Sequence, residues 1–396
     1  MSVFLGFRFR VATLVVLASL VGAGIYVGFF SRNVNAQIIE TCRNATNKPL
    51  CYTDAINTVL REEGVPQAFD IVAFVYDSDP DFAATCHAST HDLGKVAYDE
   101  FKRTGNVVLS GKETYCGYGF YHGFIEALFV ETNDPQDARD FCTYIGNNAP
   151  HPPPPEFAEG SCYHGIGHGV IDGTDPRIWG DPVAIVEPGL TLCKKLAPSD
   201  ERWLSRCYSG VFNALGNMYP HEKYKLDSSG HPYTFCENGP FDTLEKEICY
   251  NQMNTEAARR ADNRLEDILA FTHSATNERY RTTAVHEAVS FYIQQLRRQH
   301  KVLTPEEMNI CAEEPAGVIR DGCVSGFVGG IFEFGSPGQH YKEVLSICGS
   351  PLLAQDVRSV CYATTLQNSS YYYAADVMRD VCDSVPTEYH DSNCRP

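Results

Sequence analysis

Hydrophobic residues recur along this chain at spacings of three and four, the pattern that places them on one face of an α-helix. Two clear examples are the stripe Leu93, Val96, Ala97, Phe101 and the longer stripe Ala284, Val285, Ala288, Val289, Tyr292, Leu296. No convincing run alternates apolar and polar residues as a half-buried strand does. The pattern therefore predicts an all-α protein.

The first segment departs from this amphipathic pattern. Residues 11–30 are uncharged and apolar, long enough to cross the hydrocarbon core of a bilayer once as a helix. This length favours a retained signal-anchor, whereas Val34-Asn35-Ala36 is an acceptable cleavage site and keeps a cleaved signal as the alternative. Arg8 and Arg10 precede the run, which predicts a cytoplasmic N-terminus.

The chain accordingly divides into two parts. Residues 1–36 form the cytoplasmic N-terminus and the transmembrane helix or signal, and residues 37–396 form one extracytoplasmic domain. We expect a single-pass membrane protein that contacts the bilayer through residues 11–30, or else a secreted or periplasmic form.

The cysteines independently predict an oxidising compartment. All sixteen follow the apolar segment, and no C-x2-C pair typical of zinc sites occurs among them. They fall into short-gap neighbours, for which local disulfides are the economical interpretation. The predicted bridges are Cys42–Cys51, Cys86–Cys116, Cys142–Cys162, Cys193–Cys207, Cys236–Cys249, Cys311–Cys323, Cys348–Cys361 and Cys382–Cys394.

A repeat accompanies the bridges. Glycine lies three positions after the second cysteine of four pairs, at Gly119, Gly165, Gly210 and Gly326, where we expect helices to pack closely. The spacing of the units is that of two-helix repeats. It predicts disulfide-stapled helical hairpins forming a solenoid, with a closed α/α toroid as the alternative. The longer interval before Cys311 is expected to hold an extra helical pair, from Thr255 to Arg298.

Candidate chemistry follows from the register of this repeat. Six positions after the second cysteine stand His122 and His168 in two units, but Asn213 and Gly329 in two others. Packing therefore does not demand histidine there. His87/His91 and His164/His168 are spaced i, i+4, which places both rings of each pair on one face if the glycine-rich segment around His164 is helical rather than a loop.

Imidazoles in this arrangement indicate a site for zinc, copper or iron. The predicted metal ligands are His87, His91, His122, Glu126, His164, His168 and Asp172. If the metal kept an open coordination position, Glu126 or Asp172 would be available as a general base. The spacing does not decide whether the protein is an enzyme, and buried hydrogen-bonded histidines are the structural alternative.

The net charge of the chain indicates which classes of partner it can bind. The formal net charge of −18 and the lack of a basic stripe argue against nucleic acid binding and suit cations. The competing hypothesis is a protein-binding scaffold with no metal and no catalysis, because helical solenoids present concave faces and this chain is rich in tyrosine.

Overall fold

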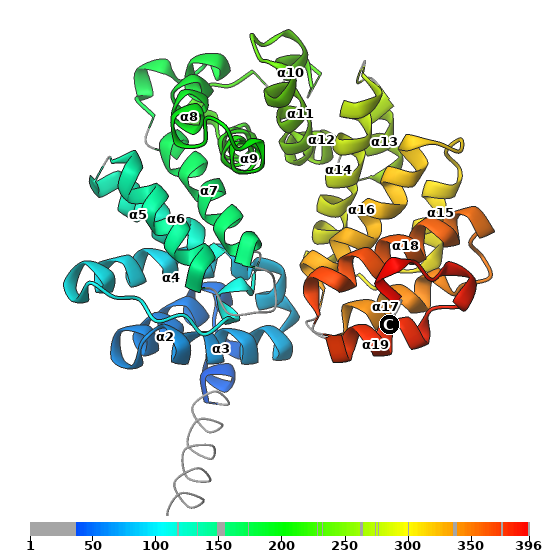
Figure 1. The fold of residues 1–396 in the computed structure, drawn as a ribbon, viewed down its shortest axis with the longest axis horizontal. Helices are drawn as coiled ribbons and strands as arrows, with labels where there is room; N and C mark the ends of the chain where they lie inside the picture. The colour runs from blue at the N-terminus through cyan, green and yellow to red at the C-terminus, as the bar shows by residue number, and fades with distance from the viewer. Residues whose placement is uncertain are drawn as a thin grey trace, which may run out of the picture.

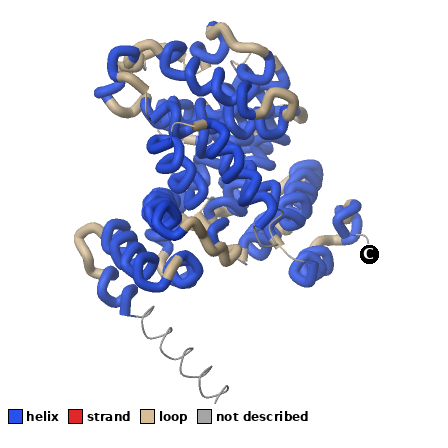
Figure 2. The backbone as a smooth tube through the Cα atoms, turned by 60° about the vertical axis from the view of Figure 1, so that its left-hand side comes forward, coloured by secondary structure: helices blue, strands red, loops and turns tan. Residues whose placement is uncertain are grey.

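The computed structural model describes residues 37–394 except 117–118, 133, 149–154, 173, 228, 232, 262–263, 274, 276, 300, 336–338 and 374. This part consists of helices and loops, with no strand, which confirms the all-α prediction (Figures 1 and 2). None of the helices in this part of the chain is both long enough and apolar enough to cross a bilayer. The predicted membrane segment, residues 11–30, lies outside the described residues.

The first helices follow a helical stretch over residues 37–43. They are α2 (Lys48–Glu63), α3 (Val65–Ser78), α4 (Pro80–Thr104), α5 (Gly119–Thr132), α6 (Pro135–Asn148), α7 (Pro155–Asp172), α8 (Pro182–Leu196) and α9 (Glu201–Met218). The remaining α-helices are α10 (Thr234–Asn238), α11 (Thr243–Gln252), α12 (Asn254–Arg260), α13 (Leu265–His273), α14 (Glu278–Arg298), α15 (Pro305–Ala312), α16 (Val318–Phe334), α17 (His340–Cys348), α18 (Gln355–Tyr372) and α19 (Ala375–Ser384). Short 3-10 turns are η1 (Lys112–Thr114), η2 (Pro176–Ile178), η3 (Glu222–Tyr224), η4 (Thr387–Tyr389) and η5 (Ser392–Cys394).

The longer helices pack against one another in the order of the chain. Contacts run from α2 to α4, α5, α7, α9, α11, α14, α16 and α18. The shorter helices α6, α8, α15 and α17 each lie against the long helix that follows them (Figure 1). Helix α4 also touches α14, and Tyr76 at the end of α3 donates a hydrogen bond from its hydroxyl to the carbonyl of Gly335 at 2.6 Å. Distant parts of the chain therefore meet.

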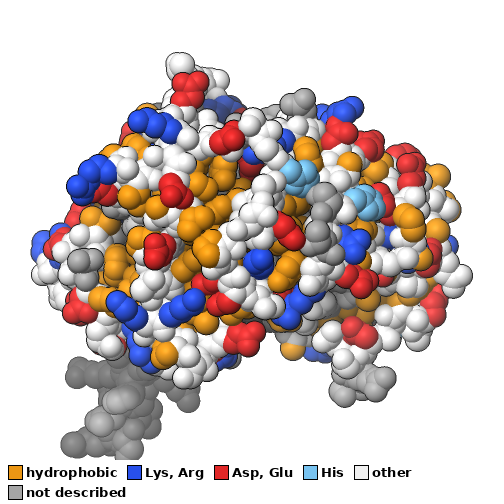
Figure 3. Space-filling view, turned by 90° about the horizontal axis from the view of Figure 1, so that it is seen from above, with side chains coloured by type: hydrophobic (Ala, Val, Ile, Leu, Met, Phe, Trp, Pro, Cys, Tyr) orange, Lys and Arg blue, Asp and Glu red, His pale blue; other side chains and the backbone are white. Residues whose placement is uncertain are grey.

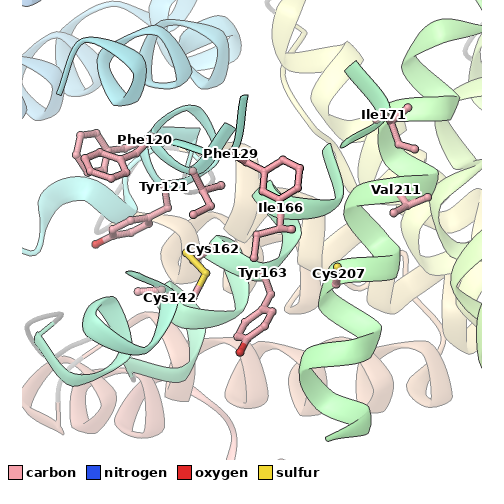
Figure 4. Close-up of a cluster of buried hydrophobic side chains, with 14 of the residues drawn as sticks. Phe120, Tyr121, Phe129, Cys142, Cys162, Tyr163, Ile166, Ile171, Cys207 and Val211 are labelled. Carbon is pink, nitrogen blue, oxygen red and sulfur yellow. A yellow bond between two sulfur atoms is a disulfide. The ribbon is translucent and has the colours of Figure 1, made fainter. Parts of the chain in front are cut away.

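All eight predicted disulfides are present, each joining a cysteine to the next one along the chain. Most of them staple a short helix to the long helix after it. Figure 4 shows Cys142 of α6 bonded to Cys162 of α7 among buried side chains of α5, α7 and α9. The eight bridges are consistent with an extracytoplasmic or secreted protein.

The repeated glycines lie where two helices come into backbone contact. A Cβ atom at Gly210 of α9 would stand 1.9 Å from the carbonyl oxygen of His164. At Gly326 of α16 it would stand 2.2 Å from the carbonyl oxygen of His286. Any larger residue would push these helices apart. The prediction of close helix packing at these positions is therefore confirmed.

The interval before Cys311 holds more than the expected pair of helices. Two short helices, α12 and α13, precede the long α14, whose predicted stripe from Ala284 to Leu296 is buried. The apolar spacing located the long helix correctly. The short helices escaped the prediction because helices of this length have barely two turns in which to show a periodic face.

Candidate functional site

Five of the predicted site histidines come together where α4, α5 and α7 pack. His122 of α5 lies at the centre of this histidine cluster. Its ring centroid is 5.2 Å from that of His87 and 6.2 Å from that of His91, both on α4. On the opposite side it is 4.7 Å from the ring of His164 and 6.1 Å from the ring of His168, both on α7.

The two i, i+4 pairs lie on continuous helices. Helix α7 runs unbroken through Gly165, Gly167 and Gly169, so the loop alternative for this segment is wrong. These glycines allow α7 to approach its neighbours: a Cβ at Gly165 would lie 2.9 Å from the Cα of His122. The glycines that cost helix stability therefore bring the imidazoles of α5 and α7 together.

Hydrogen bonds fix which nitrogen of His87 carries the proton. Its Nδ1 lies 2.9 Å from the carbonyl oxygen of Cys116, which can only accept, so Nδ1–H is the donor. In the neutral ring Nε2 then keeps its lone pair. Cys116 holds this carbonyl in place with a left-handed backbone, at φ 62°, within its disulfide to Cys86.

The same reasoning applies to His164. Its Nδ1 lies 2.7 Å from the hydroxyl oxygen of Ser209, and that hydroxyl donates its proton to the carbonyl of Arg206 at 2.7 Å. Because a serine hydroxyl has one proton, it must accept from His164. Nε2 of His164 is therefore unprotonated in the neutral ring.

His168 is held through its other nitrogen. Nε2 lies 2.9 Å from Oδ1 of Asn213, which also accepts from the amide of Asn217 at 3.1 Å. Asn213 in turn donates from Nδ2 to Oε1 of Gln252 at 2.9 Å. This network orients the amide of Asn213 so that Nε2 of His168 donates, leaving the lone pair on Nδ1.

His122 is the most enclosed member of the cluster. Its side chain is buried, and Nδ1 has no hydrogen-bond partner among the described residues. Desolvation, followed by the nearby His164 and His87, holds the pKa of His122 well below its ordinary value. Desolvation also lowers the pKa of His87, His164 and His168. At neutral pH these rings are therefore neutral, the form that binds metals.

Glu126 lies one turn after His122 and joins the cluster at its edge. Its Oε1 is 2.9 Å from Nζ of Lys95, and its Oε2 is 3.4 Å from Nε2 of His91. Burial lowers the pKa of His91 to about 3, with like charge from His87 as the next cause. Lys95 therefore supplies the positive charge that balances Glu126.

The side chains of the histidine cluster are not arranged as a complete metal site. Within the described ranges, no three His, Cys, Asp or Glu side chains are placed to share one metal ion as they stand. Asp172, the remaining predicted ligand, is the last residue of α7, one turn beyond His168, and its side chain lies outside the described part.

Sequence reasoning missed the residues that orient the rings. Ser209 stands two positions after Cys207, as His164 does after Cys162. Asn213 and His168 likewise both stand six positions after these cysteines. Equal register places such residues opposite each other on packed helices, so the repeat contained the signal. No family model, curated protein or solved structure matches this chain.

Proposed function

We propose that this protein binds a transition metal ion, zinc, copper or iron, through the histidine cluster, outside the cytoplasm. The observation that carries the proposal is the hydrogen bonding of His87, His164 and His168. Each ring donates from one nitrogen to a fixed acceptor and keeps a lone pair on the other. Histidines that ligate metals are held in this way by groups of the surrounding protein.

Two further features support the proposal. The lowered pKa values keep the rings neutral without any proton having to leave at pH 7. The four neighbouring ring centroids lie 4.7 to 6.2 Å from that of His122, so modest side-chain rotations would bring several nitrogens to one ion. Glu126 is the carboxylate within reach of this ion, and Lys95 would have to release it to make it a ligand.

The test is elemental analysis of protein purified without a histidine tag, together with the double variant His122→Asn/His168→Asn. Asparagine occupies the corresponding position of α9, so the circular dichroism spectrum should be unchanged. Bound metal should fall at least ten-fold. His273→Asn is the matched control, because His273 is a surface histidine paired with Glu314. A wild-type protein that holds no metal and takes up none of the three would contradict the proposal.

A protein-binding scaffold is the second candidate. It is favoured by neighbouring Tyr371 and Tyr372 at the end of α18, which are 40% and 44% exposed. The face shown in Figure 3 carries hydrophobic side chains among charges of both signs, a mixture compatible with a protein partner. The metal analysis separates the candidates, because a scaffold would lose neither fold nor partner when His122 and His168 are replaced.

We also propose that the hairpins form a curved array that closes on itself, the toroid rather than the open solenoid. The contact between α4 and α14 supports this, as does the hydrogen bond from Tyr76 to Gly335. In an open solenoid each repeat contacts only its neighbours, whereas these two contacts join helices far apart in the chain.

A further inference from the structure

A second region of the molecule repeats the backbone contacts of the histidine cluster. A Cβ at Gly119 or Gly123 of α5 would meet the carbonyl oxygens of His87 and His91 on α4, at 2.5 and 1.8 Å. A Cβ at Gly326 or Gly330 of α16 would meet those of His286 and Ser290 on α14, at 2.2 and 2.9 Å. The helix pairs α4/α5 and α14/α16 therefore share the same register at these contacts.

This correspondence assigns an equivalent to each polar residue. Glu126, three positions after Gly123, corresponds to Glu333, three positions after Gly330. His91 and Ser290 each place a side-chain atom 3.4 Å from Oε2 of the respective glutamate. The carboxylates thus occupy equivalent places in the two helix pairs.

The second pair has no cation at the position equivalent to Lys95. Lys95, one turn after His91, pairs with Glu126 at 2.9 Å, whereas the equivalent residue, one turn after Ser290, is Gln294. Among the described residues, no lysine or arginine forms an ion pair with Glu333, although the charge of Arg206 on α9 acts to lower the pKa of this carboxyl. The second pair also gains Glu287 on α14, whose charge, after the larger effect of desolvation, contributes to raising the pKa of Glu333 to about 7.

The groups around this place accept hydrogen bonds. Oε1 of Gln294 is buried and receives no hydrogen bond within the described part of the chain. His286 donates from Nδ1 to Ser325 at 3.0 Å, and Ser325 donates to the carbonyl of Gly322, so Nε2 of His286 is an acceptor. Glu333 is exposed, so a ligand can reach it.

We propose that Glu333, Glu287 and Gln294 bind a primary ammonium group, supplied by a small amine or by a lysine side chain. An ammonium has three donors and no acceptor, which suits two carboxylates and an unpartnered amide oxygen. It would occupy the place that Nζ of Lys95 occupies beside Glu126. The inference does not depend on metal binding at the histidine cluster.

The experiment uses the full chain in EDTA, so that metal binding does not enter, and follows the fluorescence anisotropy of dansylcadaverine, which carries one primary ammonium. Gln294→Lys should weaken binding at least ten-fold, because it supplies internally the cation that Lys95 supplies to Glu126. Glu333→Gln should do the same. Gln299→Lys is the matched control: it adds the same charge at the exposed end of α14 and should leave binding unchanged.

Two results would overturn the proposal. One is equal binding of dansylcadaverine whose amine has been acetylated, which would show that the dansyl group binds instead. The other is equal binding by the Gln294→Lys and Gln299→Lys proteins with unchanged circular dichroism. Competition by 1,4-diaminobutane would identify a free amine as the fitting ligand, and competition by N-acetyl-lysine amide alone would identify a lysine side chain. If neither competes, the proposal fails.

Discussion

The helix pairs α4/α5 and α14/α16 share a packing scheme but differ in chemistry. Both depend on glycines of one helix lying against carbonyl groups of the other. On this common frame, α4 and α5 carry His91 and His122, whereas α14 and α16 carry Ser290 and Gly329 at the equivalent places. The frame therefore forms without these imidazoles, and the difference separates the residues that build the fold from those available for binding.

The largest effects should come from the shared frame. Gly123→Ala and Gly326→Ala place a methyl group 1.8 and 2.2 Å from a backbone carbonyl oxygen, which cannot move without separating the helices. We expect each to lower the free energy of unfolding by about 3 kcal/mol or more, measured by denaturant titration. Gly230→Ala is the control, since nothing lies within 4 Å of its Cβ. If Gly123→Ala and Gly326→Ala were as stable as Gly230→Ala, close packing would not be what requires glycine at these two positions.

A smaller effect should separate the two pairs by pH. Because the folded protein holds the pKa of His91 at about 3 against an ordinary 6.5, the unfolded chain takes up its proton first as the pH falls. In metal-free protein the contribution of His91 to stability should therefore be fully present above pH 6.5 and be lost progressively between pH 6.5 and 3, while the raised pKa of Glu333 acts with the opposite sign as the pH falls through 7. For His91 alone the loss by about pH 5 is roughly 2 kcal/mol.

The pH dependence is tested by substitutions that introduce a residue of the α14/α16 pair at the equivalent position of the α4/α5 pair. His91→Ser introduces the residue found at Ser290 and should flatten the decline in melting temperature between pH 6.5 and 5, although His87, His122, His164 and His168 keep a remainder. Ser290→Ala should leave the pH profile as it is. An unchanged profile in His91→Ser would mean that folding does not lower the pKa of this ring.

The smallest expected effect on stability concerns the serines that orient the histidines. Ser209→Ala removes the acceptor of His164, and Ser325→Ala removes that of His286. Each should change the free energy of unfolding by about 1 kcal/mol. Only Ser209→Ala should weaken metal binding, by roughly 10- to 100-fold, measured by competition with a chelator. An equal loss in both variants would place the metal elsewhere.

Whether a feature could be predicted from the sequence depends on how far apart in the chain the interacting residues lie. The bridges were predictable because each joins neighbouring cysteines, and the grouping of His122 with His164 and His168 followed from the register of adjacent repeats. The contact between α4 and α14 could not be predicted, because it depends on how each hairpin between them is rotated relative to the one before it. The equivalence of Lys95 and Gln294 also stayed hidden, since α14 carries no cysteine to mark its register.

The order of the disulfides bears on how the protein matures. Each bridge joins a cysteine to its immediate successor, across 9 residues at the shortest and 30 at the longest. If residues 37–396 are exported in the order of the sequence, the cysteines emerge in that same order. An oxidant that joined each new thiol to the one before it would therefore produce the native pattern directly, with no step of disulfide reshuffling. Secretion of this protein should accordingly require a thiol oxidase and be indifferent to loss of a disulfide isomerase.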